Sequence, residues 1–282
     1  MKKCHLIVIY VFIGIFFASC ASRKESKHHD VIERFPPNLF AILDSIVEEG
    51  RQLYYSERLN WVATDIVLEQ HRQDEISGSV SWKTNDSIWT VIFFDEQMEN
   101  CIFESKFNFA LNDYTVTYSS RPLTLFEKDK IQRRNKMITE AINVYGDSLR
   151  FAGAEFGSPN IDIVRINDSL TRIYFLQGTV MPNVIPFGND YSVDFNSKLE
   201  PIAFRRYHSS LIPVRTKFED GRSSTMVMHS HLKDNPFITP TDICNFLLYR
   251  SEDLDMFFVY STAYKCKFAY SLQLNKIITA VE

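Results

Sequence analysis

The spacing of apolar residues changes along the chain, and this change restricts the possible fold more than any other feature. Residues 38 to 58 and residues 126 to 145 place apolar side chains three and four positions apart, as on the buried face of an α-helix. The segments between and after them alternate apolar with polar side chains, which is typical of β-strands with one buried face. The sequence therefore predicts an α+β fold.

In the first half, the alternating segments follow one another between the two helical ones. Asn-Asp pairs at residues 85–86 and 112–113 favour tight turns and therefore antiparallel pairing. The predicted strands cover residues 77 to 83, 87 to 94, 100 to 110 and 114 to 119. We expect residues 38 to 146 to form one α+β domain, a helix plus an antiparallel meander, with the three tryptophans in its core.

The second half repeats the alternation and adds one short helix. Strands are predicted at residues 161 to 166, 171 to 177, 191 to 195, 202 to 207, 225 to 231, 256 to 260 and 267 to 272. Residues 241 to 250 have helical spacing. We expect residues 147 to 282 to form a second α+β domain with a mixed sheet. One continuous sheet through both halves is the alternative.

The N-terminus has the composition of an export signal. Lys2 and Lys3 precede an apolar run from residue 6 to residue 17, and Ala18-Ser19-Cys20 follows. This arrangement resembles the bacterial lipoprotein signal, with Phe17 where that signal usually has leucine. The resemblance implies that residues 1 to 19 are removed and that Cys20 carries lipid, palmitate included. A plain signal peptide cut nearby is the alternative.

A lipid-bearing Cys20 would place the chain in the bacterial cell envelope, anchored to the lipid bilayer of the outer membrane. Residues 20 to 37 are polar and end in two prolines, as expected for a tether. Acidic residues outnumber basic ones by 35 to 31, and the leader takes two lysines with it. The mature chain thus has a net charge of about −6 and no basic cluster, which argues against nucleic acid as a partner.

The three remaining cysteines do not make a disulfide framework. They are Cys101, Cys244 and Cys266. A bridge between Cys244 and Cys266 is compatible with an oxidising envelope. Burial of both as small apolar residues is equally compatible with the sequence.

Two histidines share one face of the strand predicted at residues 225 to 231. His229 and His231 are two positions apart, so both imidazoles point the same way and can bind one ion. Asp242, at the start of the next helix, is a third candidate ligand. Zinc accepts imidazole nitrogens and a carboxylate in tetrahedral geometry, and we expect it as the cofactor. His208, which ends a predicted strand, is a candidate for a residue behind the ligands or in contact with a substrate.

The same residues carry a resemblance to a family. His229-Ser230-His231, seven residues and then Thr239-Pro240-Thr241-Asp242 resembles the JAMM metalloprotease motif, which is His-x-His, seven residues and Ser-x-x-Asp. The resemblance implies a catalytic zinc held by His229, His231 and Asp242. It also implies a catalytic role for Thr239 at the reacting carbonyl of an amide or isopeptide bond. In an envelope protein, the substrate would be a peptide or peptidoglycan.

The chain departs from the family motif in several places. Leu232 stands where the family usually has proline, and threonine replaces serine at residue 239. The general-base glutamate of the family has no recognisable counterpart, although Glu155, Glu200 and Glu219 precede or lie near the motif. The resemblance therefore covers the motif strongly and the rest of the second half weakly.

A purely structural reading of the motif also fits. A threonine followed by proline and, two positions later, an aspartate is a typical helix start. Two hypotheses follow for function. One is a zinc-dependent hydrolase, and the other is a non-catalytic lipoprotein that binds a partner or ligand and keeps the His-x-His…Asp motif for its structure.

Overall fold

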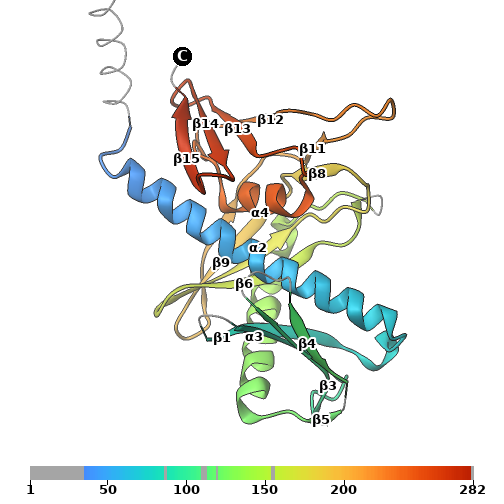
Figure 1. Cartoon of the computed structure of the whole chain (residues 1–282). Helices are drawn as coiled ribbons and strands as arrows, with labels where there is room; N and C mark the ends of the chain where they lie inside the picture. Colours follow the sequence, from blue (N-terminus) through green and yellow to red (C-terminus); the bar gives the residue numbers. More distant parts are fainter. Residues whose placement is uncertain (1–34, 86–87, 109–112, 119, 154–155, 281–282) are drawn as a thin grey trace, which may run out of the picture.

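The computed structural model describes residues 35–85, 88–108, 113–118, 120–153 and 156–280. The α+β prediction is confirmed, because in these residues three helices combine with four β-sheets (Figure 1). The predicted signal peptide, Cys20 and the tether up to residue 34 lie outside the described residues. Phe35, at the end of the predicted tether, packs its ring against Tyr264 and Phe268.

Helix α2 (Leu39–Glu69) runs diagonally across the molecule and contacts both halves of the chain (Figure 1). It is longer than the helix predicted over residues 38 to 58, because Leu59, Ala63 and Val67 continue its buried stripe. Gly50 does not interrupt it. A side chain at this position would collide with helix α4 (Pro240–Tyr249), so glycine allows the two helices to approach closely.

The first sheet is the predicted antiparallel meander, with its strands in the order β1-β2-β3-β4 and with β5 beside β3. Its members are β1 (Gly78–Asn85), β2 (Ile88–Phe94), β3 (Asn100–Asn108), β4 (Tyr114–Thr117) and β5 (Arg121–Pro122). The predicted turns at residues 85–86 and 112–113 lie partly outside the described residues. Helix α3 (Leu125–Tyr145) follows, and Thr124 and Glu127 close its first turn as a capping box.

The second sheet is also antiparallel and has the strand order β10-β9-β7-β6. Its members are β6 (Asn160–Asn167), β7 (Leu170–Leu176), β9 (Tyr191–Asn196) and β10 (Pro201–Arg206). Strands β8 (Val184–Phe187) and β11 (Ile212–Arg215) form a separate pair. That pair was not predicted, because neither segment is long enough to show an alternation.

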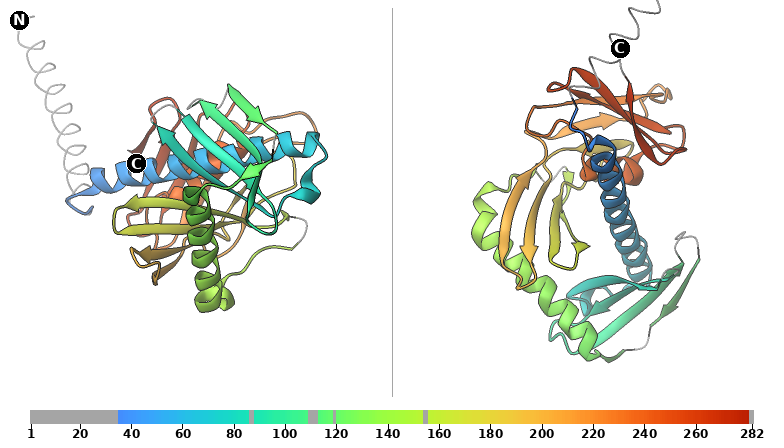
Figure 2. Two further views of the ribbon diagram at one scale, coloured as in Figure 1. Left: turned by 90° about the horizontal axis from the view of Figure 1, so that it is seen from below. Right: turned by 90° about the vertical axis from the view of Figure 1, so that its left-hand side faces the viewer.

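Helices α2 and α3 cover opposite faces of both sheets. On the first sheet, Leu59 of α2 packs with Val91 and Phe93, whereas Ile131 of α3 packs with their alternate neighbours Ile92 and Phe94. The second sheet repeats this arrangement, with Leu53 of α2 on one face and Met137 of α3 on the other. Figure 2 shows the two helices on either side of the strands. The first two sheets therefore lie side by side in one helix–sheet–helix layer structure.

The β8–β11 pair is the third of the four sheets. The fourth sheet is mixed, as predicted for the second half. Its order is β12-β13-β14-β15, and β12 is parallel to β13 whereas the other pairs are antiparallel. The bounds are Val227–His231 for β12, Met256–Ser261 for β13, Cys266–Ser271 for β14 and Lys276–Ala280 for β15. Helix α4 and the first turns of α2 pack on this sheet and form the largest core with it.

The boundary between two domains at residue 146 stays a prediction. Helix α2 packs against sheets on both sides of this boundary. Cys101, Cys244 and Cys266 are buried free thiols, so Cys244 and Cys266 do not pair in this structure. Among the described residues, none of the helices has the length and apolar character needed to span a bilayer.

A buried ion network joins α2 to the second sheet. Arg172 of β7 binds the carboxylate of Asp194 on β9 through two nitrogens, at 2.5 and 3.1 Å. The same guanidinium donates to Glu49 of α2, which also accepts the hydroxyl of Tyr174. The side chains of Arg172 and Asp194 are 7% and 5% exposed. Each charge is therefore stabilised by the other rather than by water.

Substitution of Gly50 by alanine is expected to destabilise the protein by about 1–3 kcal/mol, as overpacked sites do. The new Cβ would lie 2.8 Å from Cβ of Ile243 and 2.9 Å from the carbonyl oxygen of Pro240, so the two helices must separate. Urea unfolding measures the change. Gly146→Ala is the matched control, because that glycine has helical torsion angles and its new Cβ would make an ordinary 3.5 Å contact. Equal stability of both variants would contradict the tight α2–α4 contact.

Candidate metal centre

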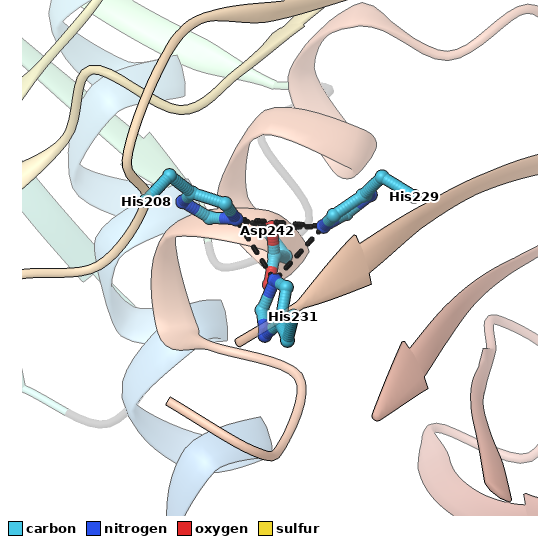
Figure 3. A group of neighbouring side chains, drawn as sticks. All are labelled: His208, His229, His231 and Asp242. Atoms are coloured by element: carbon cyan, nitrogen blue, oxygen red, sulfur yellow. Dashed lines mark hydrogen bonds and ion pairs between the residues drawn. The ribbon is translucent and has the colours of Figure 1, made fainter. Parts of the chain in front are cut away.

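Four buried side chains from three segments meet at one point (Figure 3). His208 follows β10, His229 and His231 lie on β12, and Asp242 lies in the first turn of α4. Residues 227, 229 and 231 of β12 are buried whereas 228 and 230 are exposed, as the alternation predicts. The fold therefore brings together the three predicted ligands and adds His208 to them.

The donor atoms have the spacing of a tetrahedral metal site. The Nε2 atoms of the three histidines are separated by 2.9 Å (His208–His231), 3.0 Å (His229–His231) and 3.4 Å (His208–His229). Oδ1 of Asp242 lies 3.1 Å from Nε2 of both His208 and His229, and its Oδ2 lies 3.4 Å from Nε2 of His231. Zinc bonds of about 2.0 Å in tetrahedral geometry separate neighbouring donors by roughly 3.3 Å. A His-His-His-Asp group of this size can hold a metal ion.

Two of the three histidine rings, those of His208 and His231, are oriented by hydrogen bonds at their far nitrogens, whereas Nδ1 of His229 has no partner within the described residues. Nδ1 of His208 lies 2.8 Å from Oδ1 of Asp190, and Nδ1 of His231 lies 2.6 Å from the carbonyl oxygen of Phe237. Thr241 donates its hydroxyl to the other oxygen of Asp190. Metal-binding histidines typically donate the second ring N–H to a carboxylate or carbonyl in this way. That bond leaves the Nε2 lone pair free to bind an ion.

Asp242 is held by the start of helix α4. Its Oδ2 accepts from the backbone N–H of Thr239 at 2.8 Å and from the Thr239 hydroxyl at 2.7 Å. The Thr239 hydroxyl oxygen in turn accepts from the backbone N–H of Asp242, so the two residues form a capping box. Oδ1 of Asp242 faces Nε2 of His208 and His229, each at 3.1 Å. A fully buried carboxylate oxygen needs a cation beside it, which a protonated imidazole or a metal ion can supply.

The charges of the group are strongly coupled. Burial acts to lower the pKa of His208, but Asp190 and Asp242 outweigh it and hold that pKa well above its usual value. Burial lowers the pKa of His231 to about 4. For Asp242, burial favours the neutral acid, yet the three surrounding histidines hold its pKa well below the usual range. The group therefore presents an ionised carboxylate and a neutral imidazole at His231, whereas His208 must release its proton before it can bind a metal ion.

The site is closed to solvent. His208 and His229 are 6% exposed, His231 is 2% exposed and Asp242 is fully buried. The apolar ring of Phe187 packs against the ring of His229, with the two centroids 4.5 Å apart. Four protein donors without a solvent-facing position are typical of structural zinc sites, whereas catalytic sites keep one position open.

The structure places the remaining predicted residues as follows. The Thr239 hydroxyl donates to Asp242 and does not face an open cavity. Glu200 and Glu219 are exposed and belong to other surfaces, and Glu155 and Cys20 lie outside the described residues. Asp190 is the acid that contacts His208, and no spacing pattern marks it, because it lies in the loop before β9. Comparisons with protein-family models, curated proteins and solved structures found no match to this chain.

Proposed function

We propose that this chain is a zinc protein of the bacterial envelope in which the ion has a structural role. The observation that carries the proposal is the complete set of four buried donors at tetrahedral spacing. All coordination positions of such an ion are taken by protein, so it would clamp the segment after β10 to β12 and α4.

The donor chemistry favours zinc among the common metals. Three imidazole nitrogens and one carboxylate suit zinc, whereas magnesium and calcium prefer six or more oxygen ligands. Copper(II) favours square-planar or tetragonal arrangements, and four donors at nearly equal separations do not provide one. Zinc in tetrahedral geometry is therefore the best match to this group.

The proposed cellular setting comes from the N-terminal sequence. Lipidation of Cys20 would anchor the folded body to the outer membrane through a short tether, and the metal-stabilised body would act there as a binding module. A closed metal site supports this non-catalytic reading, because it offers no position at which a substrate atom could replace a ligand.

Metal analysis of the purified protein tests the proposal. We expect about one zinc per chain, and its loss in His229→Ala and Asp242→Ala, because each variant removes one of four donors. Asp168→Ala is the matched control, since its side chain is fully exposed and remote from the group. A chain that folds without metal and takes up none from a zinc titration would contradict the structural-zinc proposal.

Hydrolysis of an amide bond is the second candidate function. It is favoured by the convergence of His229, His231 and Asp242 on one point, which is the arrangement that the JAMM resemblance implies. In that case His208 must leave its place to a water molecule, and a zinc ion would supply Lewis-acid activation of that water. The Thr239 hydroxyl would then break its hydrogen bond to Asp242 and donate to the substrate instead.

His208→Ala distinguishes the two functions, because it opens one coordination position while the other three donors remain. If the ion is structural, this variant binds zinc more weakly and melts at a lower temperature. If the site is hydrolytic, the wild-type chain cleaves amide-linked peptides or peptidoglycan fragments and loses this activity in Asp242→Ala. Absence of cleavage by both wild type and His208→Ala excludes the second candidate.

A further inference from the structure

Two sheet edges border one cavity, away from the metal centre. Strand β1 ends the first sheet and β6 ends the second, so neither has a strand on its outer side within the described residues. Both strands line a cavity of about 1600 Å³. That volume exceeds the roughly 300–1,000 Å³ of typical small-molecule sites and suits an elongated ligand.

The cavity is covered by helices on two sides. Ser56 and Asn60 of α2 line one side, and Phe126, Arg133 and Arg134 of α3 line the other. Because the same two helices cover the faces of both sheets, the space between β1 and β6 has the surroundings of a missing strand. We call this space the interstrand slot.

The width of the interstrand slot follows from the contacts of Ser56. Its Oγ lies 3.4 Å from Oγ of Ser81 on β1 and 2.8 Å from Oδ1 of Asp162 on β6. Adding the lengths of the two side chains limits the separation of the backbones to about 12 Å at most, whereas an inserted strand needs about twice the interstrand spacing of 4.7–4.9 Å. This limit leaves room for one additional strand.

The floor of the interstrand slot holds a buried pair of acids. Burial raises the pKa of Glu57 well above its usual value and raises that of Asp162 to about 6. Oδ1 of Asp162 accepts from Ser56 and from the backbone N–H of Ile163, but its Oδ2 has no donor within the described residues. The side chain of Asp162 is almost entirely buried, and the charge of Arg134 offsets part of that cost, but its Oδ2 still lacks the N–H donor that a bound ligand would supply.

We propose that the interstrand slot receives an extended peptide of a partner protein, which adds as a strand between β1 and β6. Backbone hydrogen bonds to the two edges would supply the affinity, as in other cases of strand addition. A lysine or arginine of the peptide would meet Glu57 and Asp162. Half-buried Trp82 and Trp89, on opposite faces of the first sheet, line the slot and would contact the alternating side chains of the peptide.

Selection from a phage-displayed library of random linear decapeptides tests the proposal on the full-length protein. We expect enriched peptides to contain a basic residue and to bind Ser81→Arg about tenfold more weakly or worse than wild type. Thr115→Arg is the matched control, because it places the same side chain on β4, the opposite edge of the first sheet. Asp162→Asn should weaken binding of the basic peptides while the residue keeps its contact with Ser56.

Hydrogen exchange and peptide chemistry identify the mode of binding. An enriched peptide should slow amide exchange in β1 and β6 together, and N-methylation of alternate peptide bonds should abolish this protection. The proposal is overturned if no enriched peptide loses affinity for Ser81→Arg, or if neither edge is protected. A tryptophan fluorescence change with maltohexaose and none with peptides would assign the interstrand slot to saccharides instead. Unchanged melting curves and metal content of the variants exclude misfolding as the cause.

Discussion

Removal of the proposed zinc ion by a chelator at neutral pH is expected to lower the melting temperature of the protein by roughly 10 °C or more. A structural zinc ion contributes several kcal/mol to folding, and each kcal/mol moves the midpoint of a domain of this size by about 2–4 °C. Without an ion, the Nε2 atoms of three histidines face one another and a carboxylate oxygen of Asp242 within a buried space. Differential scanning calorimetry before and after chelation measures the shift.

The metal-free variant His229→Ala is the control for this experiment. Because it lacks bound zinc, the chelator should leave its melting temperature unchanged, and re-addition of zinc should restore only the wild-type protein. The change in melting temperature of Asp190→Asn on chelation should lie between those of the wild type and His229→Ala. Loss of an oriented hydrogen bond to a ligand typically costs 10–100-fold in metal affinity. A wild-type protein that loses its zinc without any change in melting would contradict the structural role.

Replacement of Arg172 by alanine is expected to cost about 3–5 kcal/mol in the free energy of unfolding. The change leaves the carboxylate of Asp194 buried without its bidentate partner and takes from Glu49 the cation that binds it. Chemical denaturation measures this loss. The effect should exceed that of Gly50→Ala, because an uncompensated buried charge costs more than a shift of two packed helices.

Arg205→Ala is the matched control for the ion network. Arg205 contacts the same carboxylate of Asp194 at 3.2 Å, but its side chain is 47% exposed. Exposed ion pairs contribute about 1 kcal/mol or less, so this variant should remain close to wild type. If the two arginine variants lost equal stability, Arg172 would owe its importance to packing or surface charge rather than to the buried network.

Strands such as β2 could be predicted from the turn signals at their ends rather than from an alternation of burial. Val91 and Phe93 face one helix whereas Ile92 and Phe94 face the other, so both faces of β2 are apolar, yet the turns around it still mark its ends. Strands β8 and β11 were missed because each has only one short pairing with the other. The role of Gly50 has no sequence signal, because it depends on Ile243 and Pro240, which are distant in sequence.

The metal centre was predictable only where its residues are neighbours in the chain. The spacing of His229, His231 and Asp242 follows from one strand and one helix start, so local geometry was sufficient to group them. His208 was expected behind the ligands or against a substrate rather than as a fourth donor, because the position of β10 depends on sheet pairing, which no local pattern specifies. Trp82 and Trp89 pack against the cores, as expected, and also line the interstrand slot as half-buried side chains.

Helix α2 has a consequence for the order in which the chain can fold. Leu39, Leu43 and Val47 belong to the same core as Phe268 and Ile277, roughly 200 residues or more further along the chain. The first turns of α2 therefore keep their part of the apolar stripe uncovered until the last strands exist. Synthesis from the N-terminus cannot complete this core early, and a chain truncated before β13 would expose the stripe to aggregation. Such late closure is compatible with export of an unfolded polypeptide that folds as a whole at its destination.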